Sequence, residues 1–370
     1  MKNFEQLGVK KEFIKGLVDL KIVNPSEIQL AVIPLLINSK TDLIGQAQTG
    51  TGKTAAYGLP LLHQIDPKRN QIQGLILCPT RELGQQIAKQ LFKFTKYSEQ
   101  IFTESVYGGE PIDKQISALS RPTHIIVATP GRLIDLVNRN VVDLSCVKTV
   151  VLDEADEMLS MGFQKELDEI LGFLTTVENK WLFSATMPEA INLMIKKHIS
   201  FGAPHITINS KNVVNKDITH QFSVCDESEK FYLLLQFLKS EHKNRGMIFC
   251  KTKVMAQTLS KQLIAKNILT DALHGDLLQK ERDKVMRAFK NESLQILVAT
   301  DIAARGIDID GLSYVVHYQL PDKEEYYTHR SGRTARAGKK GISFSLVTPK
   351  EKKTLKFFER ALSIDFLQIR

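Results

Sequence analysis

An internal repeat constrains the fold of this 370-residue chain more than any other feature. Segment 74–91 (GLILCPTRELGQQIAKQL) aligns without gaps with segment 246–263 (GMIFCKTKVMAQTLSKQL), and eight of the eighteen positions are identical. The tripeptide Val-Ala-Thr then occurs at 127–129 and again at 298–300. Each copy has the pattern of an apolar strand followed by a helix. Chance similarity between two strand–helix units is the alternative, but the repeat favours two copies of one domain.

Continuous apolar runs alternate with helix-like segments along the chain and indicate how the two copies fold. The runs cover 74–78, 124–128, 149–152 and 181–184, and then 246–250, 295–299 and 314–318. Such runs between helices are typical of parallel sheets covered on both faces. The predicted fold class is therefore α/β, with one domain over 1–208, a polar linker over 209–217 and a second domain over 218–370.

The composition is typical of a soluble globular protein: 43% of residues are hydrophobic and 25% are charged. No apolar run approaches the length of a membrane span, and the N-terminus lacks the apolar region of a secretory signal. The cysteines have no metal-ligand spacing, and two of them lie in strand-like runs as expected of core thiols, which predicts a reducing cytoplasm. They are Cys78, Cys146, Cys225 and Cys250.

The net charge of +9 is unevenly distributed. Residues 1–210 carry 22 Lys+Arg and 22 Asp+Glu, whereas residues 211–370 carry 28 and 19. The whole excess lies in the second part, as expected if that part faces a polyanion. A generic basic surface is the alternative.

A small-residue loop in the first copy matches the phosphate-binding P-loop. Segment 43–54 (LIGQAQTGTGKT) has the pattern of a strand, a loop and a helix start, with Ala47 at the position of the first glycine. Loop N–H groups would cradle phosphates, the Lys53 ammonium would reach the outer phosphates, and the Thr54 hydroxyl would bind Mg²⁺. A Gly/Thr-rich turn is the alternative. The predicted ATP-binding residues here are Ala47, Gln48, Thr49, Gly50, Thr51, Gly52, Lys53 and Thr54.

Carboxylates at the end of an apolar strand supply the other half of this site. Asp153 and Glu154 follow the run 149–152 directly. Clustered acids at a strand end are costly unless a cation is held there. With the P-loop upstream, Asp153 is predicted to hold Mg²⁺ through water, as the Walker B acid does, and Glu154 to orient or deprotonate the attacking water.

The second copy lacks a P-loop but carries closely spaced arginines. Residues 217–224 (DITHQFSV) contain no Gly-Lys pair, so no second ATP is expected. In segment 329–336 (HRSGRTAR) the arginines recur every three residues, which would place them on one helical face where they converge on an anion. Arg333 and Arg336 are predicted to stabilise transition-state charge on the γ-phosphate. A solvated basic helix is the alternative.

Together these residues resemble the DEAD-box family of ATP-dependent RNA helicases, within helicase superfamily 2. Asp153-Glu154-Ala155-Asp156 corresponds to the name motif, and 47–54 matches the family pattern AxTGxGKT. The resemblance covers essentially the whole chain with the motifs in order. It implies two tandem RecA-like domains, each a parallel sheet covered by helices, with ATP and Mg²⁺ as cofactors and RNA as the partner.

The resemblance also implies how adenine is recognised. Segment 25–29 (PSEIQ) corresponds to the Q motif, in which Gln29 would make both hydrogen bonds on the adenine edge and so favour ATP over GTP. Relatives have Phe or Tyr in place of Ile22 and Gly in place of Lys21, so this chain would contact the base without stacking on it. The implied ATP-binding residues outside the P-loop are Phe4, Ile22, Gln29, Gly306 and Asp308.

Another set of residues resembles those that hold the sugar–phosphate backbone of single-stranded RNA in the family. The repeat pairs Thr80 with Thr252 and Thr129 with Thr300, each just after a strand, where ligands of open parallel sheets bind. Hydroxyls, N–H groups and basic side chains on phosphates bind without sequence readout, although a helix N-cap is the alternative role of each threonine. The implied RNA-binding residues are Thr80, Arg81, Gly109, Thr129, Arg132, Lys251, Thr252, Gly275, Gln279, Arg282 and Thr300.

The family further implies residues that couple ATP to RNA, namely Asp156, Ser184, Thr186 and His329, with Asp156 making hydrogen bonds rather than binding Mg²⁺. The predicted protein is a monomeric, cytoplasmic RNA-dependent ATPase that locally unwinds short RNA duplexes or remodels ribosomal or messenger RNA–protein complexes. ATP and RNA would each favour closure of the two domains and so favour one another.

Two alternatives remain: a superfamily 2 DNA translocase and a non-catalytic RNA clamp. The full motif set opposes the first, and Lys53, Glu154 and Arg333 oppose the second. No targeting tail or appended RNA-selecting domain is expected after the basic segment 350–361, so the chain is either a minimal member or truncated.

Overall fold

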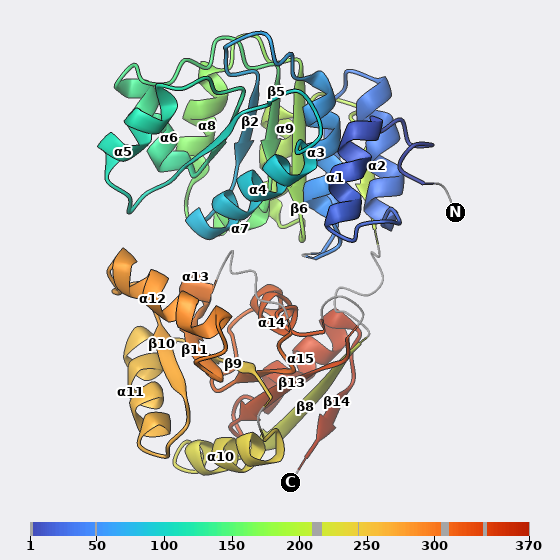
Figure 1. Ribbon diagram of the computed structural model, residues 1–370. Coiled ribbons are helices and arrows are strands. Elements are labelled where there is room, and N and C mark those ends of the chain that lie inside the picture. Colours follow the sequence, from blue (N-terminus) through green and yellow to red (C-terminus); the bar gives the residue numbers. More distant parts are fainter. Residues whose placement is uncertain are drawn as a thin grey trace. The chain divides into compact units, whose positions relative to one another are not determined.

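Side chains of successive strand residues point to opposite faces of each sheet and build an apolar layer on both. The computed structural model describes residues 3–48, 50–208, 217–242, 244–304, 311–335 and 339–369. The chain divides into two compact units, residues 1–208 and 209–370, and each has its own sheet and its own core (Figure 1).

The first unit contains a seven-stranded sheet in which every pairing is parallel, in the order β3-β4-β2-β5-β6-β1-β7. Leu77 pairs with Leu152, and Leu152 pairs with Leu182, so the loops that follow these strands leave the same edge of the sheet. The strands are β1 (Leu43–Gln46), β2 (Gly74–Leu77), β3 (Thr103–Val106), β4 (Ile125–Ala128), β5 (Thr149–Leu152), β6 (Asn179–Ser184) and β7 (His205–Thr207).

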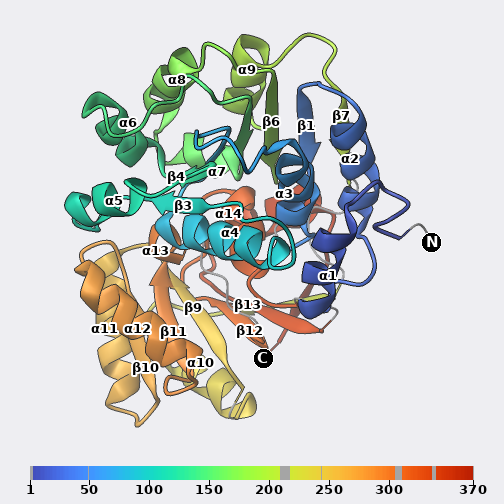
Figure 2. The ribbon, with the colours of Figure 1, turned by 45° about the horizontal axis from the view of Figure 1, so that its top comes forward.

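Helices cover both faces of this sheet. Ile76 and Trp181 point into the layer shared with α1–α4, whereas Leu75 and Leu182 point into the layer shared with α6–α9 (Figure 2). The helices are α1 (Lys11–Asp19), α2 (Glu27–Asn38), α3 (Lys53–Gln64), α4 (Arg81–Phe94), α5 (Ile112–Leu119), α6 (Pro130–Asn138), α7 (Ala155–Ser160), α8 (Gln164–Phe173) and α9 (Glu189–His198).

The second unit has a parallel seven-stranded sheet in the order β10-β11-β9-β12-β13-β8-β14. Its strands are β8 (Ile218–Val224), β9 (Gly246–Cys250), β10 (Thr270–Leu273), β11 (Ile296–Thr300), β12 (Tyr314–His317), β13 (Gly341–Val347) and β14 (Phe366–Gln368). Its helices are α10 (Lys230–Ser240), α11 (Lys253–Ile264), α12 (Gln279–Lys290), α13 (Asp301–Ala304), α14 (Glu324–Ser331) and α15 (Lys352–Leu362).

The two strand orders are the same when each strand is replaced by its repeat equivalent, which confirms the predicted α/β fold with two copies of one domain. The predicted strands at 149–152 and 246–250 coincide with β5 and β9. The apolar pattern did not predict the edge strands β3, β7, β10 and β14, which are covered less and so carry polar residues. It also missed the interior strands β8 and β13, which contain polar residues at several positions. Within the described ranges, no helix is both long enough and apolar enough to cross a membrane.

Candidate nucleotide and RNA sites

The P-loop connects β1 to α3 at the carboxyl-terminal edge of the first sheet. Gly50 and Gly52 have φ values of 84° and 90°, a left-handed conformation that a β-carbon would strain. A β-carbon on Gly52 would also lie 2.4 Å from Gln29 Nε2. Lys53 begins α3 and is buried, and its ammonium donates a hydrogen bond to the Ala47 carbonyl at 2.8 Å. Lys53 therefore lies back over the loop that is predicted to hold phosphates.

Gln29 connects the Q motif to the P-loop. Its Oε1 accepts a hydrogen bond from the Ser26 N–H, and its Nε2 donates one to the Gly52 carbonyl, both at 3.0 Å. A side-chain amide has two donor hydrogens and two acceptor lone pairs, so these contacts use half of its capacity. The adenine contacts predicted for Gln29 are therefore compatible with its position, and Gln29 also links α2 to the loop.

The aromatic predicted upstream of this motif is a core residue. Phe4 is 3% exposed, and Ile22 packs against the same apolar cluster. Lys21 has φ 60°, in the left-handed region where glycine is unstrained and a lysine costs about 1 kcal/mol. A glycine at this position would avoid that strain.

Asp153 is buried beside α3 and makes two hydrogen bonds. Its Oδ2 accepts from the Tyr57 hydroxyl at 2.8 Å, and its Oδ1 accepts from the Glu154 N–H at 3.0 Å. Burial raises the pKa of the Asp153 carboxyl, and the charge of Lys53 acts in the opposite direction. Burial also raises the pKa of the Tyr57 hydroxyl well above its usual range, as does the neighbouring Asp153 carboxylate. A cation beside this carboxylate would favour its charged form.

The donor atoms near Asp153 fit Mg²⁺. The Asp153 carboxylate and the Thr54 hydroxyl are hard oxygen ligands, and Mg²⁺ is usually held by one or two such protein groups together with phosphates. Among the described residues no group of three or more His, Cys, Asp and Glu side chains could hold a metal ion. The site therefore fits a cation that is bound mainly by nucleotide phosphates and water.

The remaining acids of the name motif point to different partners. Glu154 has φ 51° and precedes the first residue of α7. Asp156 Oδ2 accepts hydrogen bonds from the Thr186 N–H at 2.8 Å and from the Thr186 hydroxyl at 2.7 Å, and the Ser184 hydroxyl donates to the Thr186 carbonyl at 2.7 Å. These bonds connect the loop after β5 to the loop after β6.

The carboxyl-terminal edge of the first sheet divides into two neighbouring halves. The strands β5, β6 and β1 are adjacent in the sheet; residues predicted to bind nucleotide or Mg²⁺ follow β5 and β1, and the coupling residues Ser184 and Thr186 lie at or just after the end of β6. The residues predicted to bind RNA follow β3, β4 and β2, which are the next three strands. The two predicted ligand sites of this unit therefore meet where β2 pairs with β5.

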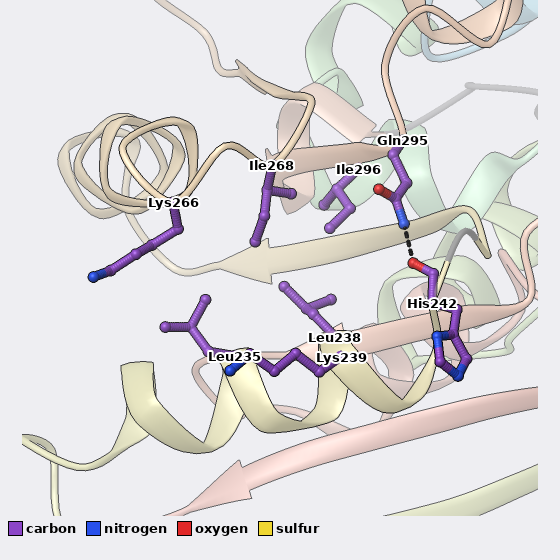
Figure 3. A pocket seen from close by; sticks show the side chains of 8 residues that line it. All are labelled: Leu235, Leu238, Lys239, His242, Lys266, Ile268, Gln295 and Ile296. Carbon is purple, nitrogen blue, oxygen red and sulfur yellow. Dashed lines mark hydrogen bonds between the residues drawn. The ribbon is translucent and has the colours of Figure 1, made fainter.

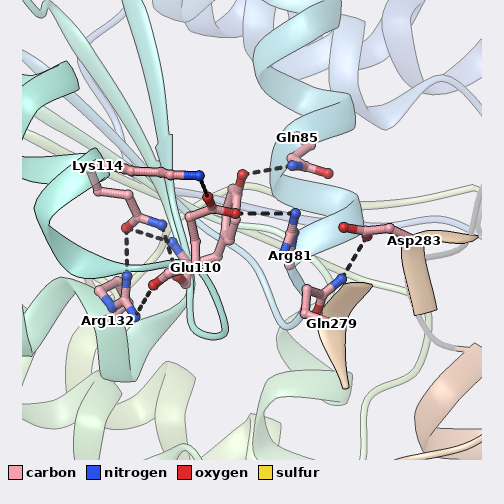
Figure 4. A network of polar contacts seen from close by, with 9 residues as sticks. Arg81, Gln85, Glu110, Lys114, Arg132, Gln279 and Asp283 are labelled. Atoms are coloured by element: carbon pink, nitrogen blue, oxygen red, sulfur yellow. Dashed lines mark hydrogen bonds and ion pairs between the residues drawn. The ribbon is translucent and has the colours of Figure 1, made fainter. Parts of the chain in front are cut away.

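Both arginines of the predicted RNA half are held by neighbouring side chains (Figure 4). The Arg81 guanidinium lies over the Tyr107 ring, 4.6 Å from its centroid, and 3.5 Å from the Glu110 carboxylate. Arg132 donates hydrogen bonds to Gln115 Oε1 at 2.9 Å and to the Glu110 carbonyl at 3.0 Å. Gly109 directly precedes Glu110 and has φ 82°.

The four paired threonines have two kinds of environment. Thr80 and Thr252 cap α4 and α11, because each side chain accepts a hydrogen bond from the N–H three residues later, at 3.3 and 3.2 Å. Thr129 stands before α6 without a cap hydrogen bond, and Thr300 ends β11. The alternative role as a helix N-cap is therefore confirmed for Thr80 and Thr252, which are equivalent in the repeat.

The other residues predicted to bind RNA in the second unit also follow β9 and β10 or begin the next helix. The Lys251 ammonium lies 2.5 Å from the Asp322 carboxylate. Gln279 donates to Asp283 Oδ1 at 2.7 Å (Figure 4). Arg282 donates to a main-chain carbonyl of α13 at 2.7 Å. Gly275 lies two residues beyond β10.

The predicted single helical face of arginines 330, 333 and 336 is wrong. Helix α14 ends at Ser331, so Arg333 lies beyond it. Arg330 is 1% exposed, and its guanidinium bonds both oxygens of the Asp301 carboxylate, at 2.6 and 2.7 Å. A buried arginine needs such a partner, so Arg330 is used to join α14 to the end of β11 and is not available to a ligand. His329 precedes it on α14.

Four predicted site residues, Thr49, Gly306, Asp308 and Arg336, lie outside the residues that the structure describes. The roles of Tyr57, Glu110 and Asp301 were missed by the sequence analysis. Tyr57 lies one helical turn after Lys53, which is a signal that could have found it. No local pattern connects Asp301 to Arg330, because they are far apart in sequence.

A cavity of about 390 Å³ lies elsewhere on the second unit (Figure 3). Apolar side chains of α10 and of the segments entering β10 and β11 line it, and Lys239 and Lys266 stand at its rim. The cavity is therefore at the amino-terminal edge of the sheet, opposite the loops described above. Among the described residues its lining includes none of those predicted to bind ATP or RNA.

Comparisons with known proteins agree with this geometry. Residues 26–194 match the family described as DEAD/DEAH box helicase, and residues 229–338 match the helicase conserved C-terminal domain. The chain is 41% identical over 360 residues to the DEAD-box ATP-dependent RNA helicase CshA of Bacillus cereus, covering 97% of this chain and 68% of the relative. It is also 41% identical over 353 residues to RhpA of Helicobacter pylori, covering 95% and 71%.

Solved structures show the same fold. Saccharomyces cerevisiae Dbp5 bound to RNA and ADP BeF3 has a TM-score of 0.92 at 32% identity, covering 100% of this chain and 96% of Dbp5. Mss116p bound to single-stranded RNA and AMP-PNP has a TM-score of 0.89 at 25% identity, covering 100% and 80%. The two sheets and their flanking helices are thus those of tandem RecA-like domains. The chain belongs to the DEAD-box family of ATP-dependent RNA helicases.

Proposed function

We propose that this protein is an RNA-dependent ATPase that binds the backbone of single-stranded RNA without reading its sequence. ATP hydrolysis would drive local unwinding of short duplexes or remodelling of RNA–protein complexes. One observation carries the proposal: the strand ends that bear the P-loop, Asp153 and Ser184 adjoin those that bear Thr80, Gly109 and Thr129 on one sheet edge. Relatives named as ATP-dependent RNA helicases support it.

The side chains of the nucleotide half have separate roles in the proposal. The Lys53 ammonium leaves the Ala47 carbonyl to bind the outer phosphates, and the loop N–H groups hold the remaining phosphate oxygens. Thr54 and Asp153 would hold Mg²⁺, which supplies charge neutralisation between the phosphates. Glu154 orients the attacking water and accepts its proton. Arg333 and Arg336 stabilise negative charge on the γ-phosphate.

Coupling between the two ligands would use the hydrogen bonds that join the loops after β5 and β6. Asp156, in the first turn of α7, accepts two hydrogen bonds from Thr186, so a displacement of Glu154 and the start of α7 is transmitted to the segment that follows Ser184 at the end of β6. His329, which precedes the buried Arg330 on α14, is proposed to act in the same coupling from the second unit.

Adenine selectivity is proposed to rest on Gln29. Turnover of ATP and GTP should be measured side by side, and a higher kcat/KM for ATP is expected. Equal values for the two nucleotides would remove Gln29 from the adenine site. Ile22 contacts but does not stack on the base, so a weaker ATP affinity than in aromatic-bearing relatives is expected.

The decisive test compares ATPase stimulation by single-stranded RNA with that by single-stranded DNA of the same sequence. Strong stimulation by RNA alone is expected, because the 2′-hydroxyl is the group by which a protein distinguishes RNA from DNA. Equal stimulation by DNA would replace the proposal with a DNA translocase, and no stimulation by either would replace it with a clamp. A monomeric, cytoplasmic protein completes the proposal, supported by the buried free thiols Cys78, Cys225 and Cys250.

A further inference from the structure

The predicted RNA half of the first sheet contains an acid among its cations. Glu110 follows Gly109 in the loop between β3 and α5, and its carboxylate is 3.5 Å from the Arg81 guanidinium and 3.2 Å from the Lys114 ammonium (Figure 4). Its carbonyl accepts the hydrogen bond from Arg132. One residue therefore contacts both arginines of the first unit that are assigned to RNA, and its carboxylate bridges one of them to a lysine.

The surroundings of Glu110 hold it in this position. The Gln115 side chain, which is 6% exposed, donates to the Tyr107 carbonyl at 3.0 Å and accepts from the Tyr107 N–H at 3.3 Å. Gln115 thereby closes the loop that carries Glu110, and the Tyr107 ring supports the Arg81 guanidinium. The carboxylate is accordingly fixed against Arg81, whose side chain is only 13% exposed, rather than free to turn into solvent.

A carboxylate in this place opposes the binding of a phosphate. A phosphate that approaches Arg81 or Lys114 must displace Glu110 from them, and the displaced carboxylate then remains close to the phosphate, where like charges repel. Glu110 also neutralises part of the positive charge of Arg81 and Lys114 before RNA arrives. Binding to this partly neutralised face therefore releases fewer counterions from the RNA. Both effects weaken RNA binding, and both disappear if the charge of Glu110 is removed.

We propose that Glu110 is a specificity-determining residue that competes with RNA phosphates for Arg81 and Lys114 and so limits the affinity of the RNA face. This inference rests on the proposed function, because it takes Arg81 and Arg132 as RNA ligands. A single phosphate cannot displace Glu110 from Arg81. The competition therefore makes the RNA face selective for an RNA backbone that contacts all of its RNA-binding residues at once.

The test uses the full chain with Glu110→Gln and a fluorescently labelled oligouridine, in the presence of a non-hydrolysable ATP analogue. RNA affinity is expected to rise about three- to tenfold. The slope of log RNA affinity against log salt concentration should become steeper by up to about 0.7 for each basic side chain that is freed from Glu110 and neutralises a phosphate. The RNA concentration for half-maximal ATPase should fall by the same factor as the dissociation constant.

Glu104→Gln is the matched control. Glu104 also pairs with an arginine of this unit, Arg121, at 3.2 Å, and its substitution makes the same change in net charge. Arg121 lies between α5 and the start of β4, at the amino-terminal edge of the sheet, so the control should leave RNA affinity within twofold of the wild type. An equal rise in both variants would mean a general charge effect and would overturn the proposal.

Three further outcomes separate the possibilities. In the double variant Arg81→Ala with Glu110→Gln, the gain over Arg81→Ala alone should be reduced, because the competition acts largely through Arg81. Weaker binding by Glu110→Gln would show instead that Glu110 positions Arg81, which overturns the proposal. If Arg81→Ala and Arg132→Ala both leave RNA affinity unchanged, the RNA face itself is misplaced and the proposed function fails at that point.

Discussion

Each strand of the first unit has an equivalent in the second, at the same place in the sheet, and the loops that follow equivalent strands differ in a regular way. Thr80 after β2 is matched by Thr252 after β9, and both cap the next helix. Asp153 and Glu154 follow β5, whereas Tyr318 and Gln319 follow its equivalent β12. The half of the edge assigned to RNA is thus present twice, and the half assigned to nucleotide only once.

This difference illustrates how function is placed on a fold. Loops at the carboxyl ends of parallel strands contribute little to the apolar layers, so they accept new residues without loss of the core. The core also differs at the last residue of these two strands. Leu152 ends β5 in an apolar layer, and His317 ends β12, where its Nε2 contacts the Ser343 hydroxyl at 3.0 Å. Four groups of experiments test the comparison.

The largest effect is expected in the nucleotide half of the first unit. Lys53→Ala and Glu154→Gln should each reduce RNA-stimulated ATP turnover by about 10³-fold or more, because they remove phosphate binding and water activation. Glu154→Gln should still bind a fluorescent ATP analogue, whereas Lys53→Ala should not. Residual nucleotide binding by Lys53→Ala would reveal a site in the second unit and break the comparison.

The neighbouring arginines of the second unit should separate catalysis from stability. Arg333→Ala should remove hydrolysis without changing the unfolding midpoint in urea. Arg330→Ala should destabilise the second unit by about 3–5 kcal/mol, because it leaves the Asp301 carboxylate without its partner.

One tryptophan makes this separation measurable. Trp181, which is the chain's single tryptophan and is fully buried, reports on the first unit by fluorescence, while circular dichroism reports on both. For Arg330→Ala the dichroism transition should move to lower urea while the fluorescence transition stays in place. Wild-type turnover by Arg333→Ala would refute its catalytic role.

Acid should destabilise the second unit through its buried histidines. Burial lowers the pKa of His220 to about 4 and holds the pKa of His317 well below its usual range. The unfolded chain binds protons at these residues below about pH 6.5 while the folded unit does not, so stability falls as the pH is lowered from about 6.5 to 4, by up to about 3 kcal/mol per histidine.

Urea unfolding followed by dichroism at several pH values would check this window, and His220→Gln should make the dependence shallower. Burial also lowers the pKa of His63 in the first unit to about 4, so the fluorescence transition should move in the same direction. A second-unit transition that does not change between pH 6.5 and 5 would contradict the prediction.

The smallest effects are expected from substitutions of the threonines that occupy equivalent positions in the two units. Thr80→Val and Thr252→Val each remove a helix cap and should cost about 1 kcal/mol of unfolding free energy, in the first and second unit respectively. Both should also weaken RNA binding by similar factors, since they are equivalent by the repeat. The serine variants retain the hydroxyl and should retain both properties. Weakening by only one of the valine variants would show that the RNA half is not duplicated in function.

Much of the fold and part of the site could be predicted because the relevant signals are local. Apolar runs predicted most of the interior strands, and the P-loop pattern predicted a strand, a loop and a helix, which the structure starts at Lys53. The interior strands β8 and β13 were missed because polar residues interrupt their apolar pattern. The edge strands could not be predicted in this way, because a strand paired on one side is covered less. Arginine spacing failed as well, since it assumed a helix through Arg333, and α14 ends two residues earlier at Ser331.

By itself the sequence determined that there are two copies of one α/β domain, that one copy has a phosphate loop, and which family the chain resembles. These properties depend on residue types at short spacings. Only the tertiary structure decided that Arg330 is held by Asp301, that Tyr57 bonds to Asp153, and that Glu110 pairs with Arg81. Such contacts join residues whose separation along the chain carries no pattern, because parallel strands bring their ends together in sheet order and not in sequence order.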